Sequence, residues 1–184
     1  MIRQALLALL VAAPAMAQSP LPFDVGGPFA LTDQHGQTRT EADPDGHPQL
    51  LFFGYANCPG ICTAALPLMA DVTDMLARDG IALRPVMITV DPARDTVETI
   101  GAPLANHHAR FVGLTGAPEA LATAYAAFSV DHSLAYEDPA YGPVYSHGSF
   151  IYLLDSAGDV LTLFPPVMDA AKATKIAKKY IGTS

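Results

Sequence analysis

The sequence predicts a single α/β domain in which a central mixed sheet is flanked by helices. Short apolar runs of strand length alternate with longer segments whose apolar residues recur at helical spacing. A strand–helix–strand alternation requires parallel strands covered by helices. The 184 residues, about half of them hydrophobic, suffice for one domain with a substantial core.

The first half of the chain contains a hairpin, a buried strand and a helix. Residues 29–33 alternate in polarity and residues 34–37 form a turn, which indicates an N-terminal β-hairpin. Residues 50–55 are almost wholly apolar, as in a strand that is buried on both faces. From about Ile61 to Leu76 the apolar positions follow helical spacing.

The second half continues the alternation and ends in a hairpin and a helix. The expected elements are strands at 83–90 and 111–114, a helix from after Asp95 to about His108, a helix at 118–128, a Tyr- and Pro-rich loop at 133–145, hairpin strands at 149–154 and 160–164, and a last amphipathic helix at 169–180. The terminal hairpins add antiparallel strands to the parallel ones, so the sheet should be mixed.

The N-terminal 17 residues have the pattern of a secretory signal peptide. Arg3 precedes an apolar run at residues 5–13, and residues 15–17 supply an Ala-x-Ala cleavage site. The alternative, an uncleaved membrane anchor, needs an apolar run of about 18 residues or more. We therefore expect cleavage before Gln18 and a soluble periplasmic domain over residues 18–184, without stable membrane insertion.

The charge of the chain argues against nucleic acid as a partner. The chain has eighteen acidic residues and ten basic ones, and no basic cluster is longer than Lys178-Lys179. The formal net charge is −8, and cleavage would remove Arg3 and leave −9. An acidic surface suits cationic partners.

Cys58 and Cys62 are the only cysteines, and they lie where a buried strand turns into a helix. Export would place them in an oxidising compartment. A disulfide between them would close a loop of five residues, which contributes only about 2 kcal/mol in the chain-entropy model. The pair is better explained by redox chemistry or metal binding than by a structural disulfide.

The position and spacing of the cysteines predict a reactive thiolate and a soft metal site. Cys58 precedes a helix N-terminus, whose unpaired amides and dipole stabilise a thiolate. Three residues separate the pair, one more than in C-x-x-C reductants of thioredoxin type. Two thiolates one turn apart can face one ion, and thiolates select Cu(I), zinc or iron–sulfur clusters. A third ligand would be a His, a Met or a carboxylate.

Histidine could complete such a site. Six histidines are available: His35, His47, His107, His108, His132 and His147. The first four fall in a hairpin turn, an acidic loop and a helix end that the topology keeps away from the cysteines. His132 and His147 flank the 133–145 loop, a region that returns to the cysteine-bearing face in thioredoxin-like folds. The residues alone leave both open.

Three motifs extend the pattern beyond the cysteines. Residues 29–36 read F-x-L-x-D-x-x-G, residues 52–62 read FFGYANCPGIC, and residues 90–96 read VDPARDT. Together they resemble the opening hairpin, the copper-binding loop and the V-D-P-x-R-D-T segment of the Sco/SenC family, over about residues 22–180. The resemblance implies a thioredoxin-like fold and a role in assembling the binuclear copper centre of cytochrome c oxidase.

The resemblance also implies the ligands, which would be Cys58, Cys62 and His147. The family's ligand histidine opens the hairpin strand, and the run from His147 to Gly158 has the expected length. His132 follows the local letters V-D but lies fifteen residues too early. Ser146 stands where the family usually has an aspartate.

Asp91 lies at the carboxyl end of a parallel strand, where such folds place their sites. We expect it to tune the thiols or to contact a copper partner. The alternative is that it caps the following helix.

The leading functional interpretation is a periplasmic copper metallochaperone. It would bind Cu(I), and with an added ligand Cu(II), and its partner would be the copper-centre subunit of cytochrome c oxidase, alongside periplasmic copper carriers or thiol reductants. We expect no ordinary substrate turnover.

The rival interpretation is a thiol–disulfide oxidoreductase in which Cys58 and Cys62 are the catalytic residues. Copper binding needs His147, whereas thiol exchange does not. A peroxidase of peroxiredoxin type would need a Thr and an Arg beside the thiolate, which the neighbours of Cys58 do not supply. A copper-responsive sensor stays open.

Overall fold

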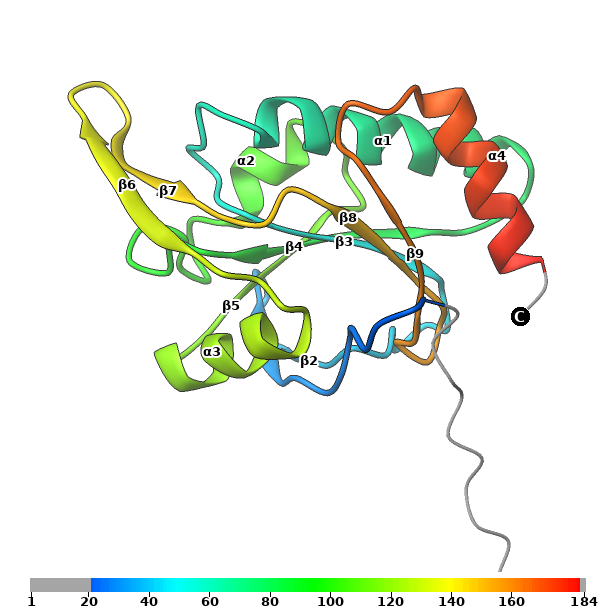
Figure 1. Ribbon diagram of the computed structural model, residues 1–184, viewed down its shortest axis with the longest axis horizontal. Helices are drawn as coiled ribbons and strands as arrows, with labels where there is room; N and C mark the ends of the chain where they lie inside the picture. The colour runs from blue at the N-terminus through cyan, green and yellow to red at the C-terminus, as the bar shows by residue number, and fades with distance from the viewer. Residues whose placement is uncertain (1–20, 183–184) are drawn as a thin grey trace, which may run out of the picture.

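A seven-stranded mixed sheet forms the centre of the protein, with helices on both faces (Figure 1). The computed structural model describes residues 21–182, and the strand order within these residues is β2-β1-β5-β4-β3-β8-β9. The expected signal peptide at residues 1–17 lies outside the described part. No described helix has the length and the apolar content needed to cross a membrane.

The pairing of the strands confirms the predicted mixture of directions. The strands are β1 (Leu31–Asp33), β2 (Thr38–Arg39), β3 (Gln49–Gly54), β4 (Arg84–Thr89), β5 (Val112–Thr115), β8 (Ile151–Leu154) and β9 (Val160–Phe164). β3, β4 and β5 are parallel neighbours, and both terminal hairpins add antiparallel strands. The buried runs thus form the parallel centre and the hairpins form the two edges.

Two apolar layers hold the helices against the sheet. α1 (Cys62–Arg78), α2 (Gly101–Ala105) and α4 (Ala170–Ile181) lie on one face and α3 (Pro118–Ala127) on the other (Figure 1). In β3, Leu50 and Phe52 belong to the first layer, whereas Leu51 and Phe53 belong to the second. Successive side chains of a strand point to opposite faces of the sheet. Because helices cover both faces of β3, the side chains at residues 50–53 are all apolar and the run is uninterrupted.

The helix expected between Asp95 and His108 is much shorter in the structure. Only Gly101–Ala105 is α-helical. The hydroxyl of Thr99 accepts a hydrogen bond from the Thr96 amide at 2.8 Å and donates one to the Arg94 carbonyl at 2.6 Å. Such side-chain bonds offer the backbone an alternative to helix hydrogen bonds, so this segment forms turns instead.

The loop expected at residues 133–145 is a β-hairpin, which corrects the sequence prediction. β6 (Ser133–Asp138) and β7 (Gly142–Ser146) pair as a separate two-stranded sheet that projects from the body (Figure 1). The Asp138 carboxylate accepts the amides of Ala140 at 2.8 Å and Tyr141 at 3.0 Å. Gly142, with φ of 72°, completes the turn.

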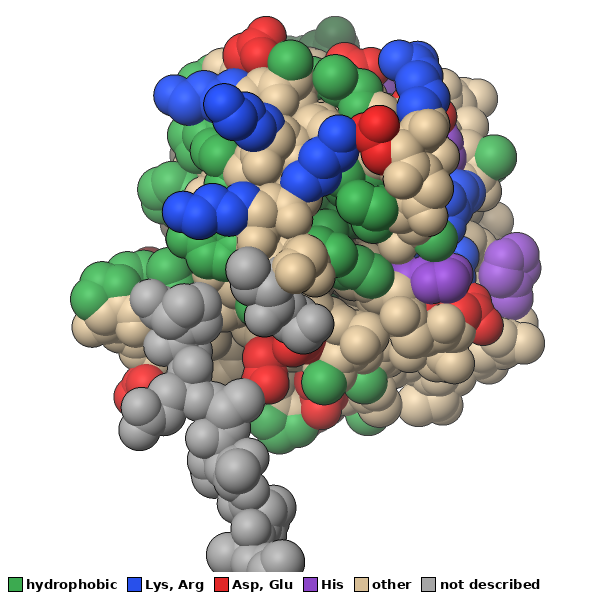
Figure 2. All heavy atoms as spheres, turned by 90° about the vertical axis from the view of Figure 1, so that its right-hand side faces the viewer, with side chains coloured by type: hydrophobic (Ala, Val, Ile, Leu, Met, Phe, Trp, Pro, Cys, Tyr) green, Lys and Arg blue, Asp and Glu red, His purple; other side chains and the backbone are tan. Residues whose placement is uncertain are grey.

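The hairpin and α4 lie at opposite ends of the molecule in Figure 1. Figure 2 looks onto the end with α4, where blue side chains gather in the upper part of the view. The lysines of α4 are exposed, and its alanines at 173 and 177 are buried. This helix is amphipathic, as its sequence predicts.

Candidate metal centre

The two cysteines lie at the junction of β3 and α1, where the sequence placed them. Cys62 is the first residue of α1 and is buried, whereas Cys58 in the preceding loop is partly exposed. A Cβ atom at Gly54 would lie 2.6 Å from Phe52 Cε1 and 3.0 Å from Cys62 Sγ. Glycine at the end of β3 therefore allows the Cys62 sulfur to lie directly against the strand.

The loop that carries Cys58 is tied to the end of β4 through Asp95. One carboxylate oxygen of Asp95 accepts the Ala56 amide at 3.0 Å and the Thr89 hydroxyl at 2.7 Å. The Cys58 amide donates to the Tyr55 carbonyl at 3.2 Å. Burial raises the pKa of Asp95, partly offset by these hydrogen bonds. The buried carboxyl thus fixes the path of the loop.

His147 follows β7 and faces the cysteines. Its Nε2 lies 4.0 Å from Cys62 Sγ, and its Nδ1 lies 2.9 Å from the Gly148 carbonyl oxygen. Because a carbonyl only accepts, Nδ1 must carry the hydrogen, which leaves the lone pair of the neutral imidazole on Nε2. The ring also packs edge-on against Phe52 and Tyr55, with centroids 5.8 and 5.9 Å away.

The three predicted ligands converge in space. One donor atom from each of Cys58, Cys62 and His147 lies within 4.8 Å of the other two. Two thiol sulfurs and one imidazole nitrogen form a soft donor set of the kind that suits Cu(I) or zinc. The residues therefore fit a copper ion, and their role as ligands stays a prediction.

Hydrogen bonding gives the two thiols opposite acidities. The hydrogen bond from Cys62 lowers the pKa of Cys58 to about 4 against the effect of burial, helped by the backbone amides of Cys62 and Gly60. The same hydrogen bond, together with burial, raises the pKa of Cys62 above its ordinary value. The metal-free pair therefore holds one proton between two sulfurs, with the thiolate on the more exposed Cys58.

Asp91 is not part of the group formed by Cys58, Cys62 and His147. It is 2% exposed, and its carboxylate pairs with the guanidinium of Arg94. The expected alternative role as a helix cap is wrong, because α2 begins ten residues later and Ile100 is its N-cap. Whether Asp91 tunes the thiols stays a prediction.

The other histidine candidate lies elsewhere. The His132 ring packs at a tilt against Tyr125 of α3, at a centroid distance of 4.5 Å. It is exposed and is not part of the group formed by the two cysteines. The geometry therefore separates the two candidates that the residues alone left open.

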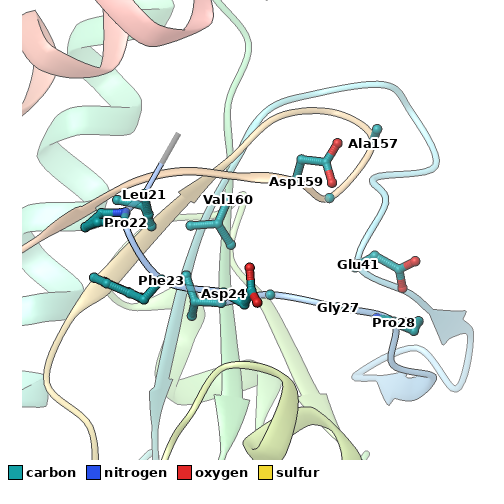
Figure 3. Close-up of a pocket in the computed structure, with 13 residues that line it drawn as sticks. Leu21, Pro22, Phe23, Asp24, Gly27, Pro28, Glu41, Ala157, Asp159 and Val160 are labelled. Carbon is teal, nitrogen blue, oxygen red and sulfur yellow. The ribbon is translucent and has the colours of Figure 1, made fainter. Parts of the chain in front are cut away.

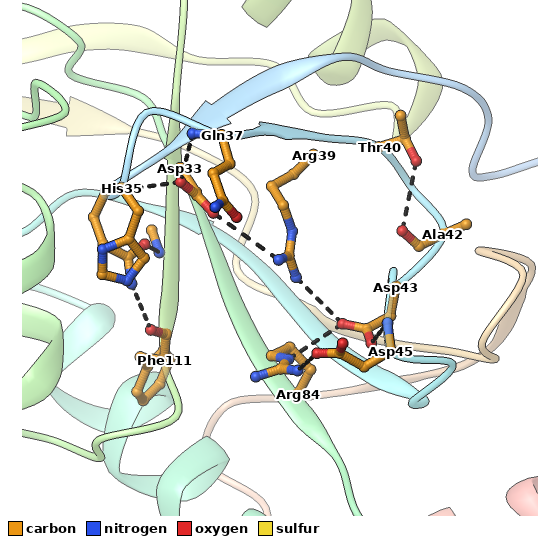
Figure 4. A network of polar contacts seen from close by, with 12 residues as sticks. Asp33, His35, Gln37, Arg39, Thr40, Ala42, Asp43, Asp45, Arg84 and Phe111 are labelled. Carbon is orange, nitrogen blue, oxygen red and sulfur yellow. Dashed lines mark hydrogen bonds and ion pairs between the residues drawn. The ribbon is translucent and has the colours of Figure 1, made fainter.

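A second cluster of metal-binding side chains is an ion-pair network. Asp43, Asp45 and His47 come within 4.8 Å of one another. The buried Asp43 carboxylate pairs with Arg39 at 3.3 Å and with Arg84 at 3.2 Å (Figure 4). Arginine already compensates the charge, so this group is assigned to the structure of the loop.

A cavity of about 730 Å³ opens between the N-terminal segment and the β8–β9 turn (Figure 3). It is lined by residues 21–28, Glu41 and residues 157–160. None of the predicted site residues lines it, so it does not belong to the cysteine site.

Comparison of the sequence with known proteins identifies the family. The family model described as SCO1/SenC matches residues 17–182. The chain belongs to the SCO1/SenC family. A SCO2-like protein of Rickettsia conorii is 34% identical over 143 residues, which cover 76% of this chain and 69% of that protein. The family prediction is therefore confirmed.

Solved Sco structures confirm the thioredoxin-like fold. Arabidopsis thaliana ScoI with copper bound has a TM-score of 0.80 and 28% identity, covering 87% of this chain and 99% of that one. Bradyrhizobium japonicum ScoI with copper bound has a TM-score of 0.74 and 31% identity, covering 85% and 99%.

Several residues that shape the site were not singled out from the sequence. Gly54 ends an apolar strand, and an isolated strand glycine signals close approach of another group. Tyr55 packs on His147, and burial raises its pKa to about 12, so it stays a neutral phenol. Asp95 and Arg94 belong to the VDPARDT motif, whose letters alone do not say which groups they contact.

Proposed function

We propose that this SCO1/SenC protein binds one copper ion through Cys58, Cys62 and His147 and carries it to the binuclear copper centre of cytochrome c oxidase. The observation that carries the proposal is the direction of the imidazole. Nδ1 is occupied by the Gly148 carbonyl, so the Nε2 lone pair faces the two sulfurs. Thiol exchange has no need of that arrangement, whereas copper coordination does. Two similar ScoI structures hold copper.

The acidities of the thiols suit uptake of Cu(I) by the reduced protein. Cys58 is already a thiolate in the metal-free state, and Cys62 holds the remaining proton. Binding of Cu(I) to both sulfurs and Nε2 would release that one proton and change no oxidation state. Because Cys58 and His147 are partly exposed, a recipient's ligands can replace them stepwise.

We place the protein in the periplasm, as the N-terminal sequence indicates. In that oxidising compartment the pair can form a disulfide, and two electrons and two protons would restore the dithiol. A thiol reductant is therefore a second partner of this function, beside a copper carrier and the copper-centre subunit of the oxidase.

Loading with copper tests the proposal directly. Reduced mature protein should take up about one copper per chain, because it has a single dithiol. Both cysteines should then resist alkylation by iodoacetamide, read by mass spectrometry. Alkylation of both thiols in protein that still holds copper would refute the site.

A thiol–disulfide oxidoreductase is the second candidate, favoured by the lowered pKa of Cys58. A partly exposed thiolate beside a buried thiol is the arrangement of an attacking and a resolving cysteine. Cells carrying His147→Ala separate the two functions. Copper delivery predicts loss of oxidase activity with partial rescue by added copper, whereas thiol reduction predicts nearly normal activity.

A further inference from the structure

His147 lies in the loop that joins β7 to β8, outside the strands of the central sheet. β6 and β7 form their own two-stranded sheet, and His147 follows the last residue of β7. The parallel strands that position the cysteines therefore do not position the imidazole through strand pairing. One end of its loop is fixed by β8, whose Ile151 pairs with Phe52 of β3. Its place beside the sulfurs depends also on what fixes the hairpin, at the other end of the loop, to the body of the protein.

Arg94 makes the contacts that fix the turn of this hairpin. Its Nη2 donates to the Pro143 carbonyl at 2.8 Å, and its Nη1 donates to the Tyr141 carbonyl. Its Nε donates to the carboxylate of Asp91. The amide of Asp91 donates in turn to the Thr89 hydroxyl at 2.9 Å, at the end of β4. One guanidinium thus links the central sheet to the hairpin.

Tyr55 fixes the other end of β7, close to His147. Its hydroxyl accepts the Tyr145 amide at 3.3 Å, and the two rings pack edge-on with centroids 5.6 Å apart. The Arg94 guanidinium lies over the Tyr55 ring, 5.7 Å from its centroid. The Tyr55 ring also packs on the His147 ring. Arg94 therefore supports both anchors of the hairpin.

The shapes of the partners match an arginine. A guanidinium presents its donors in a rigid planar fork, whereas a lysine is a single flexible point charge. Gly142 lies between the two carbonyls, and a Cβ atom there would come within 2.9 Å of Arg94 Nη1. The turn is therefore shaped around the guanidinium, and the buried Asp91 carboxylate keeps that group in place.

We propose that Arg94, held by Asp91, is a positioning residue for the copper ligand His147. This inference rests on the proposed function, in that it concerns the copper affinity of the same site. It gives Asp91 a role too: the carboxylate acts on the site through Arg94 and the hairpin.

Copper affinity in a double-mutant cycle tests the proposal. Arg94→Ala should weaken Cu(I) binding about 10-fold, within the range typical of contacts that orient a ligand. Because the effect passes through the imidazole, Arg94→Ala should cost nothing further in a His147→Ala background. Competition with a chromophoric Cu(I) chelator gives both numbers. Arg78→Ala, at the exposed far end of α1, is the matched control and should bind as the wild type does.

A readout on the metal-free protein keeps this inference separate from the proposed function. In reduced wild type, nuclear Overhauser contacts should join the His147 ring to the Phe52 and Tyr55 rings. Arg94→Ala should lose them and the Arg78 variant should keep them. The ring contacts test the role of Arg94 even if the wild type binds no copper. Failure of the wild type to bind copper would refute only the proposed function.

Arg94→Lys keeps the test decisive if the alanine variant does not fold. Lysine retains the charge opposite Asp91 but loses the fork, so it should fold and still lose ring contacts and affinity. Unchanged ring contacts in a folded Arg94 variant would overturn the inference. So would an additive loss of affinity in the double mutant.

Discussion

Gly54→Ala should damage both the stability and the copper site. The added Cβ atom would lie 2.6 Å from Phe52 Cε1 and 3.0 Å from Cys62 Sγ. Neither neighbour has room to move, since Phe52 is 0% and Cys62 2% exposed. Overpacking of this kind costs about 1–3 kcal/mol. At about 2–4 °C per kcal/mol for a chain of this size, the melting temperature should fall by several degrees.

The assay is reversible urea unfolding of the reduced protein, followed by Cu(I) competition on the folded variant. Gly60→Ala is the matched control, because its Cβ atom would meet Cys58 Sγ at an ordinary 3.9 Å. Its backbone also lies outside the left-handed region, so the control should be neutral or stabilised by about 0.4–1 kcal/mol. If Gly54→Ala were as stable and bound copper as tightly as Gly60→Ala, the close approach of Cys62 to β3 would be wrong.

Three further predictions address the thiols and the buried polar groups. Iodoacetamide should modify Cys58 of the metal-free reduced protein at a rate nearly constant between about pH 6 and 8, because its pKa is lowered to about 4; a rate rising about tenfold per pH unit would contradict this. Burial raises the pKa values of Tyr125 and Tyr152, so the folded state keeps these protons longer than the unfolded state. The free energy of unfolding should therefore be level below about pH 10 and fall above it. Replacing both tyrosines with Phe should make that fall shallower, as measured by urea unfolding at a series of alkaline pH values. Asp43→Ala should cost about 3 kcal/mol in urea unfolding, because it removes a buried carboxylate that pairs with two arginines and accepts the amides of Asp45 and His47. The exposed Asp45→Ala should cost under about 1 kcal/mol.

The elements that depend on local pattern could be read from the sequence. The apolar run of β3 is buried on both faces, and the helical spacing after Ile61 becomes α1. The position of the cysteines follows from these two elements, because the loop that joins a strand to the next helix lies at an edge of the sheet. The C-terminal hairpin could also be predicted from a short segment of sequence, because a polar turn separates two apolar strands.

The remaining features depend on contacts between distant parts of the chain. Arg94 meets Tyr141 across 47 residues, and Asp95 meets Ala56 across 39. No period or spacing encodes such pairs. The turn residues Asp138 and Gly142 did signal the β6–β7 hairpin, but the Tyr and Pro content around them suggested a loop. His147 was selected over His132 by the family resemblance, and the geometry reaches the same residue independently.

The affinity of the reduced protein for Cu(I), compared among wild type, His147→Ala and His132→Ala, tests the central claim most directly. His147 supplies the Nε2 lone pair beside the sulfurs, so its loss should weaken binding at least about 100-fold, the upper end of what contacts that merely orient a ligand contribute. His132 packs against Tyr125 away from the site, so its loss should leave the affinity unchanged. A His147→Ala protein that binds copper as tightly as the wild type would contradict the account.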